Sequence, residues 1–288
     1  MIFFRNICIG LIVFGVFFCS CRKKGCKDPM SLSYNSEAKK DDGSCTYPEN
    51  IKRSLVFKAS ATWCEQCGDL GKTFSDDITS TYPNAQIIEI HRNDDLSSNV
   101  GSLLRAHLDT VNIFSGVPSF YIGTERIDSN NYSLLNSSVN SEISEASEVN
   151  LALNHNFNDS SLNINIHSQL ANGFNGTSCY LAVYIIEDGV VKPQEIDGYI
   201  DPVSGTNFDQ NFVHNNILRA EASASASPFG VPIVFRSDGN NIISYSSINL
   251  QPSTIWNYSN LYIVAVIWQK NGDDFKFLNF VRSTNLSS

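Results

Sequence analysis

The motif Trp63-Cys64-Glu65-Gln66-Cys67 constrains this chain most, because it lies between a predicted strand and a predicted helix. The apolar run at residues 55–57 precedes it, and apolar positions at helical spacing follow it: Cys67, Leu70, Phe74 and Ile78. A thiol at the start of a helix lies beside unpaired backbone N–H groups, whose partial positive charge favours the thiolate. Cys64 is therefore the candidate nucleophile. Cys67, one helical turn further on, is the candidate resolving thiol of a dithiol/disulfide switch.

A single Cys-x-x-Cys pair has two other interpretations, half of a zinc site or a static disulfide. A structural zinc site needs a second pair of Cys or His ligands at matching spacing. The five histidines include no pair at the spacing H-x3-5-H, and the chain has no second Cys-x-x-Cys. We therefore favour the redox pair and predict neither a metal nor a cofactor. The static disulfide stays open as the alternative.

The N-terminus has the pattern of an export signal. Arg5 precedes an apolar segment over residues 7–18, which is too short for a comfortable transmembrane span. The end of this segment resembles a bacterial lipoprotein signal, in which cleavage before a cysteine is coupled to acylation of that cysteine. The resemblance implies a lipid anchor on Cys21, after the small residue Ser20, with Cys19 as the alternative. An ordinary signal peptide with incidental cysteines is the other interpretation.

Cysteine usage agrees with export to an oxidising compartment. Of the eight cysteines, two would be lost with residues 1–20 and one would carry lipid. Of the remaining five, we expect Cys26 to pair with Cys45 and Cys64 to pair with Cys67. Cys179 lies in an apolar run, and a buried, inert thiol is the favoured interpretation.

Residues 22–50 are polar and rich in turn signals. The stretch 25–45 closely resembles a short module, G-C-x-D-P-x4-Y-N-x2-A-x2-D-D-G-S-C, found in surface and secreted proteins of some Gram-negative bacteria. So short a segment cannot build a core, so we expect its disulfide to order it, contributing roughly 3 kcal/mol. Its aspartates are compatible with calcium, but Asp-Asp-Gly more often forms a turn. We interpret 22–50 as a spacer between the lipid and the first domain.

Residues 51–148 alternate between strand and helix patterns, and the predicted order is β-α-β-α-β-β-α. The predicted strands include residues 54–59, 85–91 and 125–127, and the first helix should end near Tyr82-Pro83. This order resembles the thioredoxin fold, because Trp-Cys-x-x-Cys begins the first helix and Val-Pro-Ser precedes the third strand. We therefore predict an α/β thioredoxin-like domain at 51–148.

The resemblance implies a substrate groove beside the dithiol. Pro118 should follow a cis peptide bond, and Trp63, Val117 and Pro118 should line the groove for an extended protein or peptide substrate. Taken alone, Pro118 would be an ordinary trans residue of an edge strand. One departure concerns Lys58, which replaces the buried acid that lies six positions before the first cysteine in well-known members. Lys58 either stabilises a thiolate or extends to the surface.

Residues 149–288 have the alternation and turn signals of an all-β domain, and we predict an immunoglobulin-like β-sandwich. Residues 211–219 resemble a stretch in a family of Gram-negative outer-membrane lipoproteins, in which a thioredoxin-like half precedes a β-sandwich half. His214 and Arg219 lie in this stretch without an accompanying nucleophile or acid motif, so we expect structural or binding roles for them.

The favoured function is a lipid-anchored thiol-disulfide oxidoreductase of the cell envelope, whose partners are protein or peptide thiols and disulfides. The alternative is a non-enzymatic binding or adhesion lipoprotein whose thioredoxin-like domain is a scaffold. The net charge of −9 disfavours nucleic-acid binding, because no basic stripe replaces the phosphate counterions. We expect the protein at the outer membrane, held by lipid at residue 21 and facing the periplasm, since the basic residues 22–24 do not look like an acidic surface-export tag. Exposure at the cell surface is the alternative.

Overall fold

The computed structural model describes residues 22–112, 116–127, 131–158, 160–223, 225–252 and 254–286. The predicted signal peptide and the candidate lipidation sites at Cys19 and Cys21 lie outside the described residues. The chain divides into two compact units, Met1–Cys45 and Thr46–Ser288.

The described part of the first unit is ordered around one disulfide. Cys26 is fully buried and is bonded to Cys45, with an S–S distance of 2.04 Å. The aspartates form turns: Asp41 Oδ1 accepts a hydrogen bond from Gly43 N at 2.8 Å, and Asp42 Oδ1 accepts one from Ser44 N at 3.1 Å. These carboxylates therefore satisfy backbone donors in turns.

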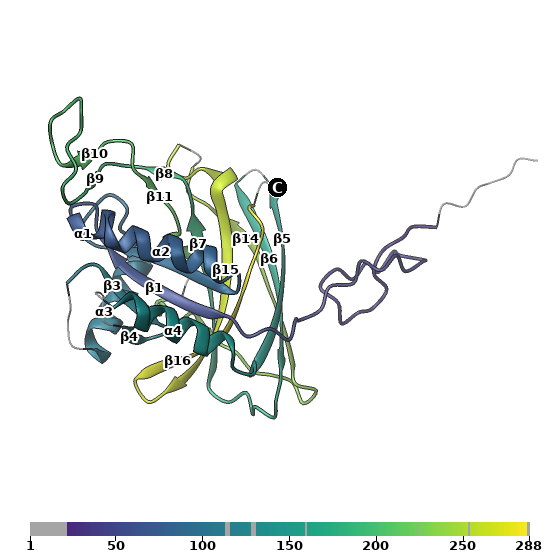
Figure 1. The fold of residues 1–288 in the computed structure, drawn as a ribbon. Coiled ribbons are helices and arrows are strands. Elements are labelled where there is room, and N and C mark those ends of the chain that lie inside the picture. The colour runs from purple at the N-terminus through teal and green to yellow at the C-terminus, as the bar shows by residue number, and fades with distance from the viewer. Residues whose placement is uncertain are drawn as a thin grey trace, which may run out of the picture. The chain divides into compact units, whose positions relative to one another are not determined.

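The second unit combines a large mixed sheet with four α-helices along its described length. In chain order its elements are β1 (Ser54–Ser60), α1 (Glu65–Gly68), α2 (Leu70–Thr81), β2 (Ala85–His91), α3 (Asn99–Val111), β3 (Ser119–Ile122), β4 (Glu125–Ile127), α4 (Tyr132–Ile143), β5 (Val149–Asn158), β6 (Ser161–Leu170), β7 (Cys179–Glu187), β8 (Val190–Val191), β9 (Gln194–Glu195), β10 (Phe208–Asp209), β11 (Val213–His214), β12 (Ile217–Glu221), β13 (Val231–Pro232), β14 (Asn240–Asn249), the 3-10 helix η1 (Tyr258–Asn260), β15 (Leu261–Asn271) and β16 (Asp274–Arg282). Figure 1 shows these elements along the chain.

The large sheet has nine strands in the order β16-β15-β7-β12-β2-β1-β3-β4, with β13 paired to β7. β1 runs parallel to β2 and antiparallel to β3, while β15 pairs antiparallel with both β7 and β16. A second sheet has the order β14-β6-β5. One sheet therefore holds strands from both sides of position 148. The fold is β-rich with mixed sheets, and the division into a thioredoxin-like domain and an immunoglobulin-like domain stays a prediction.

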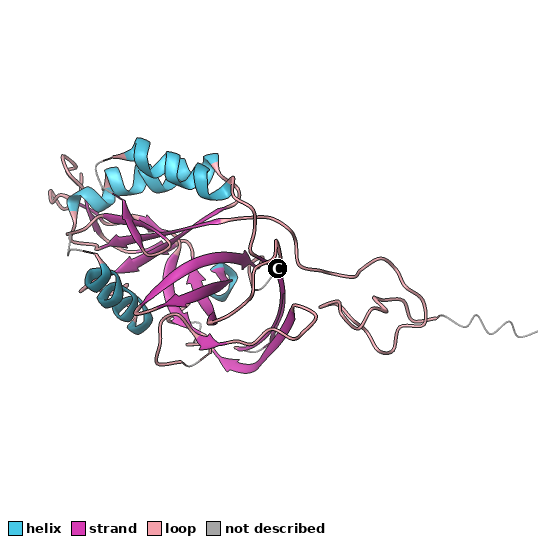
Figure 2. Ribbon diagram, turned by 90° about the horizontal axis from the view of Figure 1, so that it is seen from below, coloured by secondary structure: helices cyan, strands magenta, loops and turns pink. Residues whose placement is uncertain are grey.

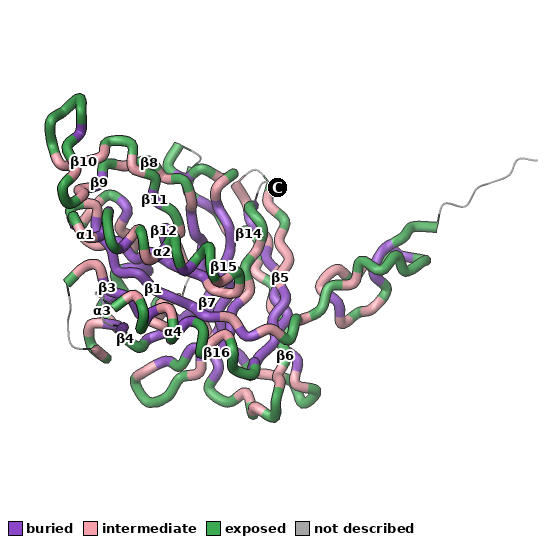
Figure 3. The backbone as a smooth tube through the Cα atoms, in the orientation of Figure 1, coloured by how far each residue is buried: buried purple, intermediate pink, exposed green. Residues whose placement is uncertain are grey.

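Strand alternation builds two apolar cores on opposite faces of β7 and β15. Tyr184 and Trp268 point into one core together with Phe57 of β1 and Leu104 of α3. The intervening residues of β7 and β15 point into the other core, against β5 and β6: Leu181, Val183, Ile185, Ile263, Ala265 and Ile267. Because both faces are covered, the sequences of these two strands are nearly continuous apolar runs. Figure 3 shows both strands largely in the colour of buried residues.

Helices lie on two sides of the strands of the large sheet (Figure 2). Leu55 and Phe57 of β1 point toward α3, whereas Val56 points toward Ile78 of α2 and Leu135 of α4. β1 is thus buried along its whole length, which fixes the position of the motif that follows it. No helix in the described ranges is long and apolar enough to span a membrane.

Over residues 51–148 the structure follows the predicted order of elements, with one difference in the first helix. That helix is divided into α1 and α2 at Asp69, whose φ of −103° and ψ of −94° are not helical. The predicted strand at 85–91 coincides with β2, and α2 ends at Thr81, just before Tyr82-Pro83. α3 begins after Ser98, whose side chain accepts a hydrogen bond from Gly101 N at 3.1 Å.

Candidate functional site

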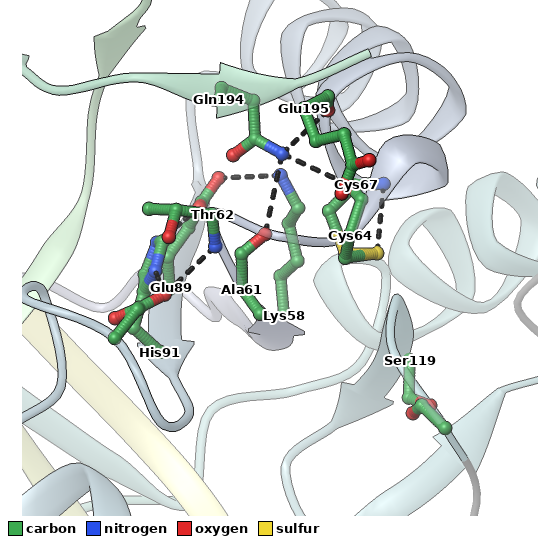
Figure 4. Close-up of a disulfide and its surroundings, with 12 residues drawn as sticks. Lys58, Ala61, Thr62, Cys64, Cys67, Glu89, His91, Ser119, Gln194 and Glu195 are labelled. Carbon is green, nitrogen blue, oxygen red and sulfur yellow. Dashed lines mark hydrogen bonds and ion pairs between the residues drawn. A yellow bond between two sulfur atoms is a disulfide. The ribbon is translucent and has the colours of Figure 1, made fainter. Parts of the chain in front are cut away.

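The Cys-x-x-Cys motif lies where β1 gives way to α1. Cys64 is the N-cap residue of α1 and forms a disulfide with Cys67, with an S–S distance of 2.14 Å. The backbone N–H of Cys67 donates to Cys64 Sγ at 3.1 Å (Figure 4). Cys64 is 7% exposed and Cys67 is 2% exposed, so the first cysteine is the more accessible of the two.

The predicted groove residues lie partly around this disulfide. Val117 packs against Cys64, Cys67 and Ala61, and the Val117–Pro118 peptide bond is cis. Trp63 is 46% exposed at the surface beside the motif. A small apolar surface with an exposed aromatic side chain is therefore available next to the sulfur atoms.

Lys58, on β1 six residues before Cys64, forms a buried ion pair that the sequence did not predict. Its Nζ donates to Glu89 Oε1 at 2.7 Å, and the two residues are register partners on the parallel strands β1 and β2. Lys58 is 2% exposed, so the interpretation that it extends to the surface is wrong. Burial alone would raise the pKa of Glu89, but the positive charge of Lys58 and the contact with His91 lower it to about 2.

His91 continues this polar network. Its Nδ1 lies 2.8 Å from Asp94 Oδ2, and its Nε2 lies 3.4 Å from Glu89 Oε2. Burial acts to lower the pKa of His91, but these two carboxylates raise it. The same Asp94 oxygen accepts a hydrogen bond from Thr62 N at 2.8 Å, which connects the network to the loop before Cys64.

His214 and Arg219 have structural partners. The His214 ring packs edge-on against His91 with a centroid distance of 5.5 Å, and its Nε2 lies 3.2 Å from Lys192 O. Burial, together with the charge of His91, lowers the pKa of His214 to about 4, so this ring is neutral at pH 7. Arg219 Nε donates to Glu187 Oε2 at 2.7 Å. These contacts agree with the structural role expected for both residues.

A segment that sequence reasoning missed packs against the motif. We call residues 192–209 the cover segment; its strands β9 and β10 lie beside α1 in Figure 1. Glu195 N donates to Thr62 O at 2.9 Å, and Asn207 Nδ2 donates to Glu65 Oε1 at 3.2 Å. Gln194 Nε2 donates to Cys64 O at 2.9 Å. No periodicity or motif in the sequence signals a contact across about 130 positions.

Gly68 is the point of closest approach between α1 and the cover segment. A Cβ atom at this position would lie 2.7 Å from Glu195 O and 2.8 Å from Gln194 Cγ. We expect Gly68→Ala to lower the free energy of unfolding by about 1–3 kcal/mol, because the added methyl overpacks this contact. Urea denaturation checks this, with Gly116→Ala as control because a Cβ there has no atom of the described residues within 4 Å beyond its chain neighbours. Equal midpoints for the two variants would contradict the contact.

The site offers no metal centre among the described residues, where no group of three or more His, Cys, Asp and Glu side chains has a suitable arrangement. Cys179 is buried, and burial raises the pKa of its thiol to about 11. It is therefore protonated at neutral pH and unsuited to nucleophilic attack. The chemistry of the site thus rests on the Cys64–Cys67 pair.

The fold and the site together describe a β-rich protein with a disulfide at a helix start, and comparison with known proteins identifies its family. The model of the family described as "Outer membrane protein Omp28" matches residues 106–284, which is more than half of the chain. This chain therefore belongs to the Omp28 outer membrane protein family. The match includes Val117, Pro118 and Gln194 but begins after the Cys-x-x-Cys motif.

One solved structure shows a similar fold. HBP35 of Porphyromonas gingivalis superposes with a TM-score of 0.67 at 12% sequence identity, covering 83% of this chain and 76% of that one. A domain of the outer membrane lipoprotein Omp28 from Porphyromonas gingivalis has 14% identity and a TM-score of 0.30, covering 48% of this chain and 88% of that domain. No curated protein matches the sequence. Family membership supports an outer-membrane location.

Proposed function

We propose that this protein is a lipid-anchored thiol-disulfide oxidoreductase of the cell envelope, acting on protein or peptide thiols and disulfides. One observation carries the proposal: Cys64 and Cys67 form a disulfide in which the N–H of Cys67 already points at Cys64 Sγ. A donor in that position stabilises the thiolate that forms on Cys64 when the disulfide is reduced. The predicted thioredoxin-like organisation of residues 51–148 belongs to this proposal.

The reaction is a two-electron exchange between dithiol and disulfide. The Cys64 thiolate attacks a substrate disulfide, forms a mixed disulfide and releases one substrate thiolate, which takes up a proton. The Cys67 thiolate then attacks Cys64 Sγ and releases the second substrate thiol as the Cys64–Cys67 disulfide forms. A protein dithiol returns two electrons and two protons to the pair. With the pair oxidised, the same steps run in reverse to oxidise a substrate dithiol.

The buried ion pair of Lys58 and Glu89 does not take part in proton transfer under this proposal. Glu89 has a pKa of about 2, so its carboxylate is too weak a base to accept the proton of a thiol. The proton on Cys67 therefore passes to the departing substrate thiolate or to solvent. We assign Lys58 and Glu89 the role of holding β1 and β2 in register.

The proposal includes a lipid anchor at the N-terminus and a place at the outer membrane. Acylation of Cys21 would attach the protein to the outer membrane, with residues 22–50 as a spacer and the periplasmic face as the working side. The disulfide between Cys26 and Cys45 gives this spacer a fixed shape despite its lack of an apolar core.

The reduction potential of the Cys64–Cys67 pair tests the function. The full chain in detergent is equilibrated with glutathione buffers, free thiols are alkylated, and mass spectrometry counts the label on the peptide that carries the pair. We expect a value between about −120 and −270 mV, the span of known catalytic pairs. A value below about −300 mV would show a structural bridge. It would favour the second candidate, a non-enzymatic binding or adhesion lipoprotein, whose static disulfide agrees with the low exposure of Cys67.

A further inference from the structure

We propose that Gln194 is a positioning residue for the Cys64–Cys67 pair and sets its reduction potential from the cover segment. The effect on turnover rests on the proposed function, whereas the effect on the potential can be measured whether or not the pair is catalytic. The observation behind it is a buried side-chain amide held against the backbone of the motif (Figure 4).

The amide of Gln194 is surrounded by carbonyl oxygens. The residue is 1% exposed, and its Nε2 lies 2.9 Å from Cys64 O, 3.3 Å from Ala61 O and 2.9 Å from Glu195 O. The first two oxygens belong to the turn that connects β1 to α1. A single side chain therefore joins both ends of this turn to a strand about 130 positions later.

The hydrogen bond from Gln194 to Cys64 O affects a second hydrogen bond, from the N–H of Cys67 to Cys64 Sγ, which stabilises the thiolate. The N–H of Cys67 is shared between Cys64 O at 3.0 Å and Cys64 Sγ at 3.1 Å. Gln194 occupies part of the acceptor capacity of Cys64 O and holds this carbonyl in place. The N–H of Cys67 thus stays directed at the sulfur as well as at the oxygen.

Contacts of the neighbouring residues hold the side chain of Gln194 in position. Glu195 N donates to Thr62 O, and the backbone of the cover segment lies so close to Gly68 that no larger residue fits without displacement. An amide without acceptors in a buried site would be costly, so its donors remain directed at the motif. The geometry therefore resists movement of the Cys64 carbonyl when the disulfide opens.

The sign of the effect follows from which state the hydrogen bond favours. A donor aimed at Cys64 Sγ stabilises the thiolate, and stabilising the reduced form makes a pair more oxidising. Removing the amide should raise the pKa of the Cys64 thiol and make the potential more negative. We expect about a tenfold change in the exchange equilibrium with glutathione, which corresponds to about 30 mV.

The test compares Gln194→Met with the full-length wild-type protein in detergent. Methionine has a similar size and shape but donates no hydrogen bond, so packing alone predicts no shift. The matched control is Gln210→Met on the exposed stretch after β10, where the amide donates to Phe208 O at 3.5 Å, far from the disulfide in the chain. The readouts are the potential and the pH dependence of Cys64 alkylation by iodoacetamide.

Each outcome bears on the inference. A shift of the potential toward negative values in Gln194→Met, absent from Gln210→Met, supports it. Equal potentials and equal alkylation profiles for all three proteins would overturn it. If Gln194→Met does not fold, Gln194→Asn is measured instead: its shorter amide should give a smaller shift of the same sign, and an unchanged potential would again overturn the inference. A wild-type potential below about −300 mV would reject the proposed enzyme, while the shift stays measurable with dithiothreitol as reductant.

Discussion

Replacing Glu89 with glutamine is expected to lower the free energy of unfolding by about 3–5 kcal/mol. Lys58 is 2% exposed, and Glu89 Oε1 at 2.7 Å is the anionic partner of its ammonium group. Without that carboxylate, a positive charge remains buried with only a neutral amide beside it. Chemical denaturation with urea measures the change directly.

Two comparisons separate this effect from general loss of charge. Lys72 and Asp76 form an exposed ion pair on α2, and Asp76→Asn should cost less than about 1 kcal/mol. The double variant Lys58→Met/Glu89→Leu should recover much of the loss, because it leaves no unpaired charge. A Glu89→Gln protein as stable as Asp76→Asn would show that the buried pair does not hold the two strands.

The stabilisation by the Lys58–Glu89 pair should also depend on pH. The folded-state pKa of Glu89 is about 2, below the ordinary value of 4.5, so the pair contributes stability above pH 4.5 and loses it as the pH falls toward 2. The shift corresponds to about 3 kcal/mol. Glu89→Gln should therefore show a flatter decline of stability between these two pH values than the wild-type protein.

Replacing Cys64 with serine is expected to reduce dithiol exchange with a peptide disulfide to the uncatalysed rate. The serine hydroxyl does not form the mixed disulfide, and Cys67 is only 2% exposed, so it cannot replace the lost nucleophile. The measurement is thiol release from a fluorescent peptide disulfide, with a protein dithiol as the reductant.

Two further cysteine variants complete this experiment. Cys67→Ser should trap a mixed disulfide between Cys64 and the peptide, because the resolving thiol is absent. Cys179→Ser is the control, since that thiol is buried and its pKa is raised to about 11. Turnover that persists in Cys64→Ser at the wild-type rate would reject the proposed enzyme.

The sequence alone determined the local order of this protein. Apolar runs located β1 and β2, because a strand between two cores reads as a nearly continuous apolar run. The Cys-x-x-Cys spacing placed two thiols one helical turn apart, and the structure joins them as a disulfide. The turn chemistry of residues 41–44 was equally readable, since the donors and acceptors lie two positions apart.

Only the tertiary structure decided what surrounds the disulfide. Parallel pairing of β1 with β2 sets Glu89 opposite Lys58, and the sequence of either strand does not state the register. Gln194 reaches Cys64 because strands from both sides of position 148 share one sheet, which carries the cover segment over α1. Sequence periodicity reports which face of an element is buried, because that depends on neighbours within a few residues. It does not report which distant side chain meets that face, because long-range pairing depends on the packing of the whole chain.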